Sequence, residues 1–167
     1  GRDVKRFRRE PTPRAEEAPV EFEFEDDGLA PGRIELRPGE IVGLAGVIGS
    51  GRSQVLATLF GAAGKARVGG VRVGSPHHAI DLGMFLVPED RKLSGLVLEL
   101  SVRENLAMAI LPRLLVAGLF VNAGKERREA LRWVESLNLR PPQPEKRVRE
   151  LSGGNQQKVV VGKALAT

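Results

Sequence analysis

The sequence predicts an α/β fold, and three observations support this. Apolar and acidic residues alternate from Val20 to Phe24, which is the period-two pattern of a half-buried strand. The continuous apolar run Ile41–Ala45 leads into a glycine loop and then a helical pattern over 52–60, the order strand, loop, helix. In the second half, 123–137 carries apolar residues on one helical stripe and charges opposite.

Further elements of the first half follow from short-range signals. A second short strand is expected at Ile34–Leu36, and the run Ile41–Ala45 is typical of a strand buried on both faces. The helix that begins at Arg52 is expected to stop at Gly61. The pair Gly69-Gly70 separates two short apolar-alternating runs and predicts a tight hairpin of 66–68 with 71–73.

The rest of the chain is predicted to be mainly helical. Ser75-Pro76 is a good start for a short helix that ends at Gly83. Met84–Val87 is predicted as a further buried strand, leading into the charged turn Pro88–Lys92. Ser101 and Glu104 form a capping-box pattern that opens a helix through about Ile110. A last helix is expected from Gln156 to the end of the chain.

The composition limits the function classes. Hydrophobic residues make up 41% and charged residues 28%, as in folded domains, whereas aromatic residues make up only 4%, too few for stacking platforms for single-stranded nucleic acid. There is no Cys, which excludes disulfides, thiol catalysis and cysteine-ligated metals, and the adjacent His77 and His78 are expected to be exposed helix residues. The N-terminus lacks the apolar segment of a signal peptide, and Pro112 and Arg113 interrupt the most apolar stretch, Leu106–Val121, so no membrane span is expected.

The net charge of +5 is unevenly distributed. Residues 1–14 hold six bases and two acids, 15–27 hold seven acids, and 28–167 hold twenty bases and twelve acids. Residues 1–19, rich in Pro and in blocks of charge, are typical of a linker. The basic body suits nucleic acid, an anionic membrane or a phosphorylated ligand, and the charge alone does not choose between them.

One stretch fits the spacing of a phosphate-binding loop, G-x-x-x-x-G-K-[ST], except that Arg replaces Lys. Glycines in such a loop let backbone N–H groups turn toward a polyphosphate, and the helix start adds its positive dipole end. The Ser hydroxyl is a candidate Mg²⁺ ligand, and the Arg neutralises phosphate without reproducing a compact ammonium. The alternative is a glycine-rich turn without a ligand. The candidate nucleotide-binding residues are Gly46, Gly49, Ser50, Gly51, Arg52 and Ser53.

A second candidate anion site lies at Leu151–Lys158, where a Ser and two glycines precede a helix. The sequence Ser-Gly-Gly alone is a common loop, but the two sites together are more informative. Ser152, Gly153, Gly154 and Gln156 are its candidate nucleotide-binding residues.

The sequence resembles the nucleotide-binding domains of ABC transporters. GVIGSGRS looks like a Walker A variant, and LSGGNQQK looks like the ABC signature motif, with an ending similar to that of simple-sugar importers of the ribose, xylose, galactose and arabinose type. LVPEDRKLSGLVLELSVRENLAMA resembles a stretch of the second of the two fused ATP-binding domains of those importers, and the starting GRDV resembles the end of the first. The resemblance extends from Gly1 to Thr167.

The resemblance implies a P-loop NTPase with a RecA-like core, an antiparallel β-subdomain and an ABC-specific helical subdomain, truncated before the Walker B strand. It implies a linker over 1–19, the β-subdomain and first part of the core over 20–100, the helical subdomain over 101–150 and the signature with its helix over 151–167. It also implies that adenine rests on an early-strand aromatic, for which Phe22 and Phe24 are candidates, with core packing as the alternative. Trp133 is expected to pack in the core or against the permease.

The resemblance further implies the mechanism and the partners. Two such domains hold ATP and Mg²⁺ at their interface, so Ser152–Gly154 would contact nucleotide held by a second ATP-binding domain. Closure would drive sugar uptake through transmembrane permease subunits, with a sugar-binding protein as indirect partner, at the cytoplasmic face of the cell membrane. Glu89 takes the place of the Q-loop glutamine and is the candidate catalytic residue and, with Ser53, Mg²⁺ ligand; an ordinary turn carboxylate is the alternative.

Two departures from the family pattern concern catalysis. Arg52 replaces the Walker A Lys, and the sequence stops before the strand whose carboxylates hold Mg²⁺ and activate water. ATPase activity is therefore expected of the whole subunit and not of this fragment alone. Two other functions stay open: an ABC-class ATPase that acts on nucleic acid, and a structural remnant that binds no nucleotide. The basic body suggests the first of these, but the few aromatic residues and the NQQK ending argue against it, so no nucleic acid partner is expected.

Overall fold

The computed structural model describes residues 18–167, which form two compact units. The N-terminal unit ends at Leu82 and the C-terminal unit begins at Gly83. The linker predicted over 1–19 lies almost entirely outside the described residues. The predicted boundary between a β-rich part and a helical part, at residues 100 and 101, stays a prediction.

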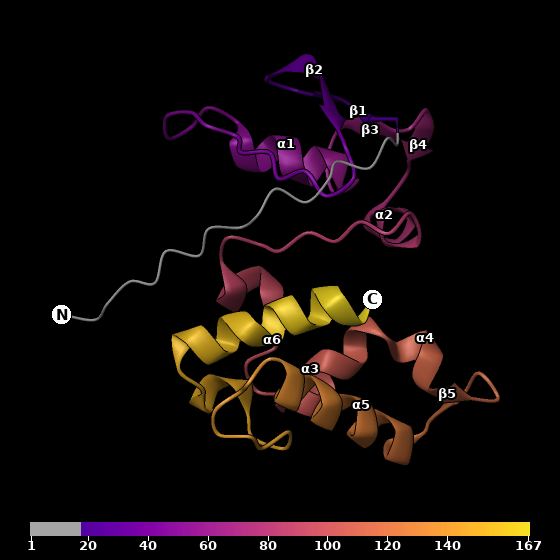
Figure 1. Cartoon of the computed structure of the whole chain (residues 1–167), viewed down its shortest axis with the longest axis vertical. Helices are drawn as coiled ribbons and strands as arrows, with labels where there is room; N and C mark the ends of the chain where they lie inside the picture. Colours follow the sequence, from indigo (N-terminus) through magenta and orange to yellow (C-terminus); the bar gives the residue numbers. More distant parts are fainter. Residues whose placement is uncertain (1–17) are drawn as a thin grey trace. The chain divides into compact units, whose positions relative to one another are not determined.

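The N-terminal unit is built on a four-stranded antiparallel sheet (Figure 1). Its strands are β1 (Val20–Asp26), β2 (Leu29–Leu36), β3 (Lys65–Val68) and β4 (Val71–Val73), in the order β2-β1-β3-β4. Alternation places charged residues of β1 and β3 on one face, and Phe22, Phe24 and the buried Ala66 on the other. The strand patterns and the Gly69-Gly70 hairpin were predicted; the long β2 and its tight turn with β1 were not.

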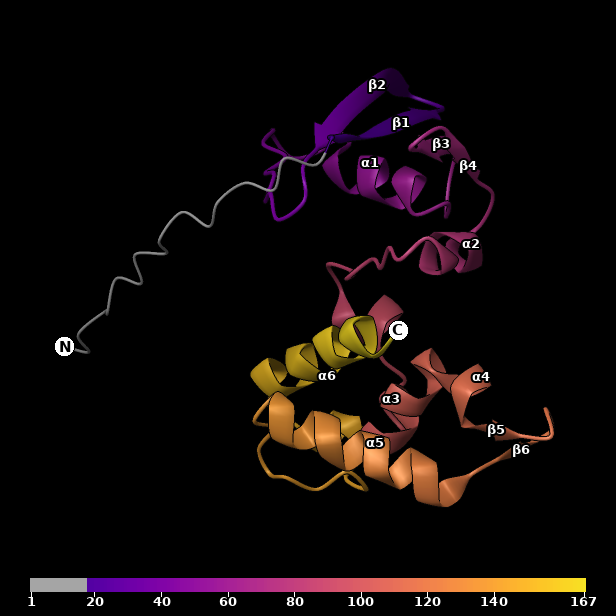
Figure 2. The same ribbon diagram turned by 45° about the vertical axis from the view of Figure 1, so that its right-hand side comes forward.

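Helix α1 (Arg52–Leu59) packs against this sheet, as both ribbon views show (Figures 1 and 2). Its buried residues are Val55 and Thr58. A polar contact adds to the packing: Asp26 at the end of β1 accepts hydrogen bonds from Gln54 Nε2 at 2.8 Å and Thr58 Oγ1 at 3.3 Å. The bond from Gln54 lowers the pKa of the Asp26 carboxyl. The helix that follows the glycine loop is thus fixed to β1.

The short helix α2 (Pro76–Asp81) completes this unit as predicted. The Ser75 hydroxyl accepts a hydrogen bond from the His78 N–H, and Pro76 occupies the first turn. His77 is exposed, as predicted, and its Nδ1 lies 3.2 Å from Asp81 Oδ2, whereas His78 is half-buried, contrary to the prediction.

Two predicted strands are wrong. Residues 41–45 and 84–87 are not strands in the structure, and the apolar side chains of the first run are exposed, with Ile41 85% accessible and Val42 45%. A buried strand needs neighbours for its backbone hydrogen bonds. Within residues 18–167 no segment pairs with either run, so apolar sequence alone does not produce a strand there.

The C-terminal unit is mainly helical (Figure 2). Helix α3 (Val102–Ala109) packs against both α5 (Ala123–Ser136) and α6 (Gly153–Ala166), and the core between them includes Leu106, Val134 and Val159, each at most 2% exposed. The predicted helices over 101–110 and 123–137 are confirmed. The elements are η1 (a π-helical turn, Arg91–Gly95), α3 (Val102–Ala109), α4 (Leu111–Leu114), β5 (Leu115–Val116), β6 (Phe120–Val121), α5 (Ala123–Ser136), η2 (a 3₁₀ turn, Val148–Glu150) and α6 (Gly153–Ala166).

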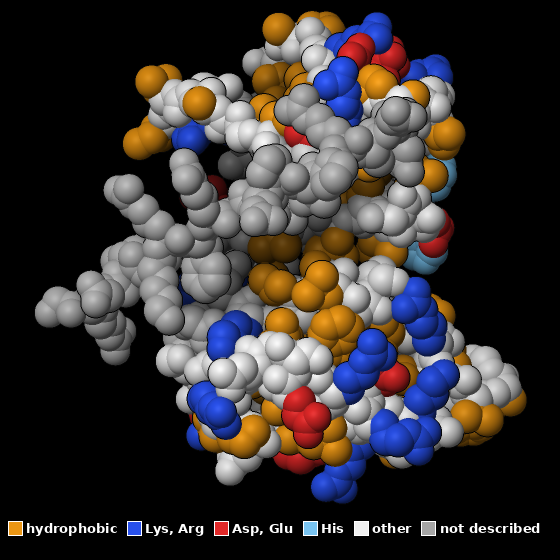
Figure 3. Space-filling view, viewed as in Figure 1, with side chains coloured by type: hydrophobic (Ala, Val, Ile, Leu, Met, Phe, Trp, Pro, Cys, Tyr) orange, Lys and Arg blue, Asp and Glu red, His pale blue; other side chains and the backbone are white. Residues whose placement is uncertain are grey.

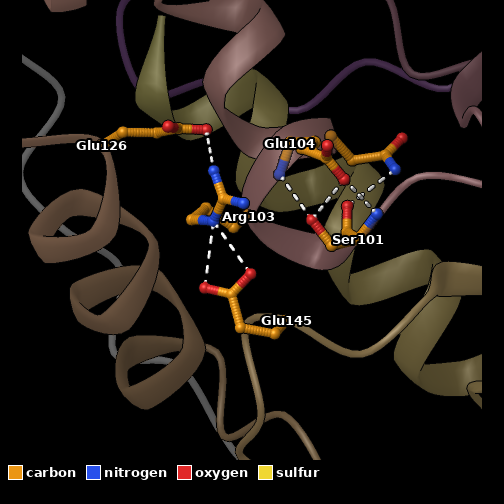
Figure 4. A network of polar contacts seen from close by, with 6 residues as sticks. Ser101, Arg103, Glu104, Glu126 and Glu145 are labelled. Carbon is orange, nitrogen blue, oxygen red and sulfur yellow. Dashed lines mark hydrogen bonds and ion pairs between the residues drawn. The ribbon is translucent and has the colours of Figure 1, made fainter. Parts of the chain in front are cut away.

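The start of α3 carries the predicted capping box (Figure 4). The Ser101 hydroxyl accepts from the Glu104 N–H at 3.1 Å, and Glu104 Oε2 accepts from the Ser101 N–H at 2.8 Å. The hydrogen bonds from Ser101 lower the pKa of the Glu104 carboxyl. This contribution to stability is present above pH 4.5, the ordinary value, and is lost as the pH falls through the lowered folded-state pKa.

Arg103 joins α3 to α5 and to the proline-rich segment that follows α5 (Figure 4). Its Nη1 lies 2.6 Å from Glu126 Oε1, and its Nε donates to Glu145 at 3.0 Å. Glu126 is only 9% exposed, so its carboxylate depends on this partner.

We expect Arg103→Met to lower the free energy of unfolding of the C-terminal unit by about 3 kcal/mol, because it leaves Glu126 buried and unpaired. The matched control is Arg149→Met, which removes an exposed pair with Glu99 and should cost less than about 1 kcal/mol. Urea unfolding followed by circular dichroism measures both. Equal losses in the two variants would contradict this role for Arg103.

Candidate functional site

The glycine loop ahead of α1 is exposed and strongly curved. Gly49 and Gly51 have φ values of 85° and 83°, in the left-handed region that favours glycine, and the Ser50 N–H donates to the Val47 carbonyl at 3.1 Å. Gly51 is the N-cap of α1, without a side-chain cap. Residues 46–50 are all exposed. The loop therefore places the uncapped start of a helix at the surface, where its N–H groups can bind an anion.

Individual glycines of this loop have different surroundings. An added Cβ at Gly46 would overlap the Ser50 hydroxyl, so Gly46 leaves room for that side chain. At Gly49 an added Cβ would meet nothing within 4 Å. Glycine at position 46 is thus needed for the Ser50 side chain to fit, whereas the space beside Gly49 is open.

Arg52 and Ser53 form the first turn of α1, and both are exposed. A guanidinium is a suitable partner for phosphate oxygens, and a hydroxyl oxygen is a ligand type that Mg²⁺ accepts. The residues of this turn therefore fit a magnesium–nucleotide complex. Among residues 18–167, no cluster of three or more His, Cys, Asp or Glu side chains is suited to hold a metal on its own.

The second glycine-bearing helix start, that of α6, is also exposed. Ser152 is the N-cap, and Ser152, Gly153 and Gly154 are all accessible rather than packed against the core of their unit. Asn155 fixes the turn: its amide donates to the Arg140 carbonyl at 2.8 Å and to Ser152 Oγ at 3.0 Å. An added Cβ at Gly154 would meet nothing within 4 Å. The surface of this helix start is open at Gly154.

Gln156, a candidate nucleotide-binding residue, is buried in the structure. Its side chain is 5% exposed, its Oε1 accepts from Arg91 Nε at 3.2 Å, and its Nε2 donates to the Val148 carbonyl at 3.1 Å. The amide is engaged inside the unit, because its position on α6 points it inward. In this structure Gln156 supports the helix start instead of facing solvent.

The turn that contains Glu89 lies in the C-terminal unit. Glu89 is exposed and lines an open cavity of about 500 Å³ with Asp90, Arg91 and Lys92. Asp90 caps η1, since its carboxylate accepts from the N–H groups of Lys92 and Leu93. Ser53 lies in the other unit, so a joint role of Ser53 and Glu89 in binding Mg²⁺ stays a prediction.

Other singled-out residues have packing roles. The Phe24 ring lies over Gly32, where an added Cβ would overlap it, and Phe22 is half-buried on the same face of β1. Trp133 packs against the helical core, and the Arg132 guanidinium lies 5.6 Å from its ring centroid. A further cavity of about 620 Å³ lies over charged residues of the β-sheet and includes no residue of the glycine loop.

Arg91 was not singled out by sequence reasoning. Its guanidinium contacts Gln156 and lies beside Gly153, at the start of α6. The only local signal was Asp90 as a helix-capping residue, and nothing in the pattern showed that residue 91 reaches a segment 65 positions away.

Comparison with known proteins decides the family. The model of a family described as "ABC transporter" matches residues 29–167, which include both glycine-bearing helix starts. This chain belongs to the ABC transporter family. None of the helices described in residues 18–167 has the length and apolar character needed to cross a membrane.

Curated relatives within the ABC transporter family are named for sugar import. The chain is 44% identical, over 80% of its length, to "Ribose import ATP-binding protein RbsA" of Geobacillus kaustophilus, and 42% identical, over 92%, to the protein of the same name in Chromobacterium violaceum. It is 39% identical, over 86%, to "Putative ribose/galactose/methyl galactoside import ATP-binding protein 3" of Agrobacterium fabrum. The chain spans 28%, 33% and 31% of these relatives.

Proposed function

We propose that this chain is part of an ABC-type ATPase subunit that couples the binding and hydrolysis of ATP to sugar uptake. The observation that carries the proposal is the pair of exposed, glycine-bearing helix starts at α1 and α6, in a chain that belongs to the ABC transporter family. Sugar as the transported class rests on the names of the relatives.

The two helix starts would serve different nucleotides. Gly46–Ser53 would hold the phosphates of one ATP, with Arg52 neutralising charge and Ser53 offering its hydroxyl to Mg²⁺. Ser152–Gly154 would contact an ATP held by a second ATP-binding domain, which explains why this helix start is exposed. ATP bound between two helix N-termini stabilises the closed pair of domains, and its hydrolysis removes the bridging phosphate.

The remaining parts of the proposal rest on the family resemblance. The glycine loop and α1 would belong to a RecA-like core of the P-loop NTPase type. Residues 101–150 of the C-terminal unit would form the helical subdomain, which contacts a membrane permease near Glu89, on the cytoplasmic side of the membrane. A sugar-binding protein would deliver the sugar. The Arg in the phosphate loop favours binding over rapid phosphoryl transfer at this site.

A binding measurement tests the phosphate loop. We expect Arg52→Ala, in the natural polypeptide that contains this sequence, to weaken Mg-ATP binding at this site by about tenfold or more, because a charge-assisted hydrogen bond contributes about 1.5–3 kcal/mol. Equilibrium dialysis with labelled nucleotide measures the affinity, beside a control with inorganic phosphate alone. Arg72→Ala, an exposed Arg on β4, is the matched control and should bind normally. Unchanged affinity in Arg52→Ala would show that the loop is not a nucleotide site.

A further inference from the structure

We propose that Arg91 is a positioning residue that fixes the start of the signature helix α6 to the turn carrying Glu89. The inference rests on the proposed function, because the helix start in question is the one that would contact nucleotide. It concerns contacts inside the C-terminal unit alone.

The first contact is a relay of two hydrogen bonds, of which the second is buried. Arg91 Nε donates to Gln156 Oε1 at 3.2 Å, and Gln156 Nε2 donates to the Val148 carbonyl at 3.1 Å. Gln156 is 5% exposed and Val148 is fully buried. Val148 begins the 3₁₀ turn η2, which leads into Ser152. The relay therefore connects Arg91 to α6 and to the segment before it.

The second contact places the guanidinium beside the first residue of α6. An added Cβ at Gly153 would lie 2.7 Å from Arg91 Nη2, so glycine at this position leaves room for the Arg. A cation next to a helix N-terminus opposes the helix dipole, and the first turn of α6 contains no acidic residue to offset it. The position of Arg91 is thus electrostatically unfavourable for α6 by itself and favourable once an anion binds there.

The segment that follows Arg91 is held along the length of α6. Gly95 is buried against Val160, and Lys163 Nζ donates to the Gly95 carbonyl at 2.7 Å. Asp90 caps the π-helical turn η1, which lies alongside α6 (Figure 2). With Arg91 at one end and Lys163 at the other, a displacement of the Glu89 turn moves α6 with it.

The experiment compares ATP hydrolysis by variants of the natural polypeptide assembled with its partners. Arg91→Gln should lower kcat by about tenfold or more, because the start of α6 would no longer be held in the geometry needed for its contacts with nucleotide. KM for Mg-ATP should change less than about twofold, because the nucleotide is held mainly by the phosphate loop of the opposite domain. Arg91→Lys should not restore the rate, since a single ammonium cannot both donate to Gln156 and lie beside Gly153. Lys92→Gln, an exposed cation on the same turn, is the matched control and should keep wild-type kcat.

A double-mutant cycle tests the relay itself. Arg91→Gln combined with Gln156→Leu should lose no more kcat than the more damaged single variant, because both remove the same connection. Additive losses would overturn the inference, as would a kcat within about twofold of wild type for Arg91→Gln, or restoration by Arg91→Lys. Normal hydrolysis in wild type and in all Arg91 variants would refute the role of Arg91 and leave the proposed function standing. Absence of nucleotide-dependent hydrolysis in wild type would instead refute the proposed function.

Discussion

Gly154→Ala is expected to lower ATP hydrolysis by the assembled protein about a hundredfold without loss of folding stability. Among residues 18–167 an added Cβ at Gly154 meets nothing within 4 Å, and Ala is the better helix former, so the free energy of unfolding should stay equal or rise by up to about 1 kcal/mol. Any loss of activity must then come from a ligand that approaches this backbone closely. Loss of one preorganised donor contact to a developing charge costs about 10²-fold or more.

The matched control for this variant is Gly124→Ala. Gly124 is the second residue of α5, as Gly154 is of α6, and it too is exposed. Because α5 has no proposed ligand at its start, hydrolysis should be unchanged in this control. Wild-type activity in Gly154→Ala would exclude close contact between nucleotide and the α6 start. Steady-state hydrolysis assays and thermal unfolding, run on the same preparations, measure the two effects.

Asn105→Ala is expected to destabilise the C-terminal unit by about 3 kcal/mol or more. Asn105 is fully buried; its Oδ1 accepts from the Val97 N–H at 2.9 Å, and its Nδ2 donates to the carbonyls of Val97 at 2.9 Å and Ser101 at 3.0 Å. Removing the amide takes the acceptor from the Val97 N–H, removes one of the donors to each of the two carbonyls, and opens a cavity at a fully buried position. The segment 97–101 joins η1 to α3, so loss of the Asn105 hydrogen bonds to this segment would also loosen the turn that carries Arg91.

Chemical denaturation measures this effect on the free energy of unfolding. Met108→Ala is the control on the same helix: Met108 is 41% exposed, and its replacement should change stability by about 0.5 kcal/mol at most. A loss in Asn105→Ala no larger than in Met108→Ala would show that the amide contributes little to the fold.

Local signals predicted those parts of the fold whose cause is local. The Ser101 and Glu104 capping box, the Ser75 cap and the Gly69-Gly70 hairpin depend on side chains and backbone within a few residues, and all three form. The run Ile41–Ala45 does not form the predicted strand, because a strand depends on hydrogen-bond partners elsewhere in the chain. The hairpin of β5 and β6 was missed, since its exposed apolar residues give no alternating pattern.

In the candidate site, too, features with a local cause were predicted and features that depend on distant segments were not. The glycines and the Ser of both helix starts were predicted from motif spacing, because the bends at Gly49 and Gly51 need positive φ values that glycine readily adopts. Sequence by itself therefore determined the family resemblance and the helices α1, α2, α3 and α5, whereas α4 was missed and α6 begins at Gly153, three residues before the predicted Gln156. Only the tertiary structure decided that Gln156 points inward and that Arg91 reaches the start of α6, because packing between distant segments fixes side-chain direction and leaves no trace in local spacing.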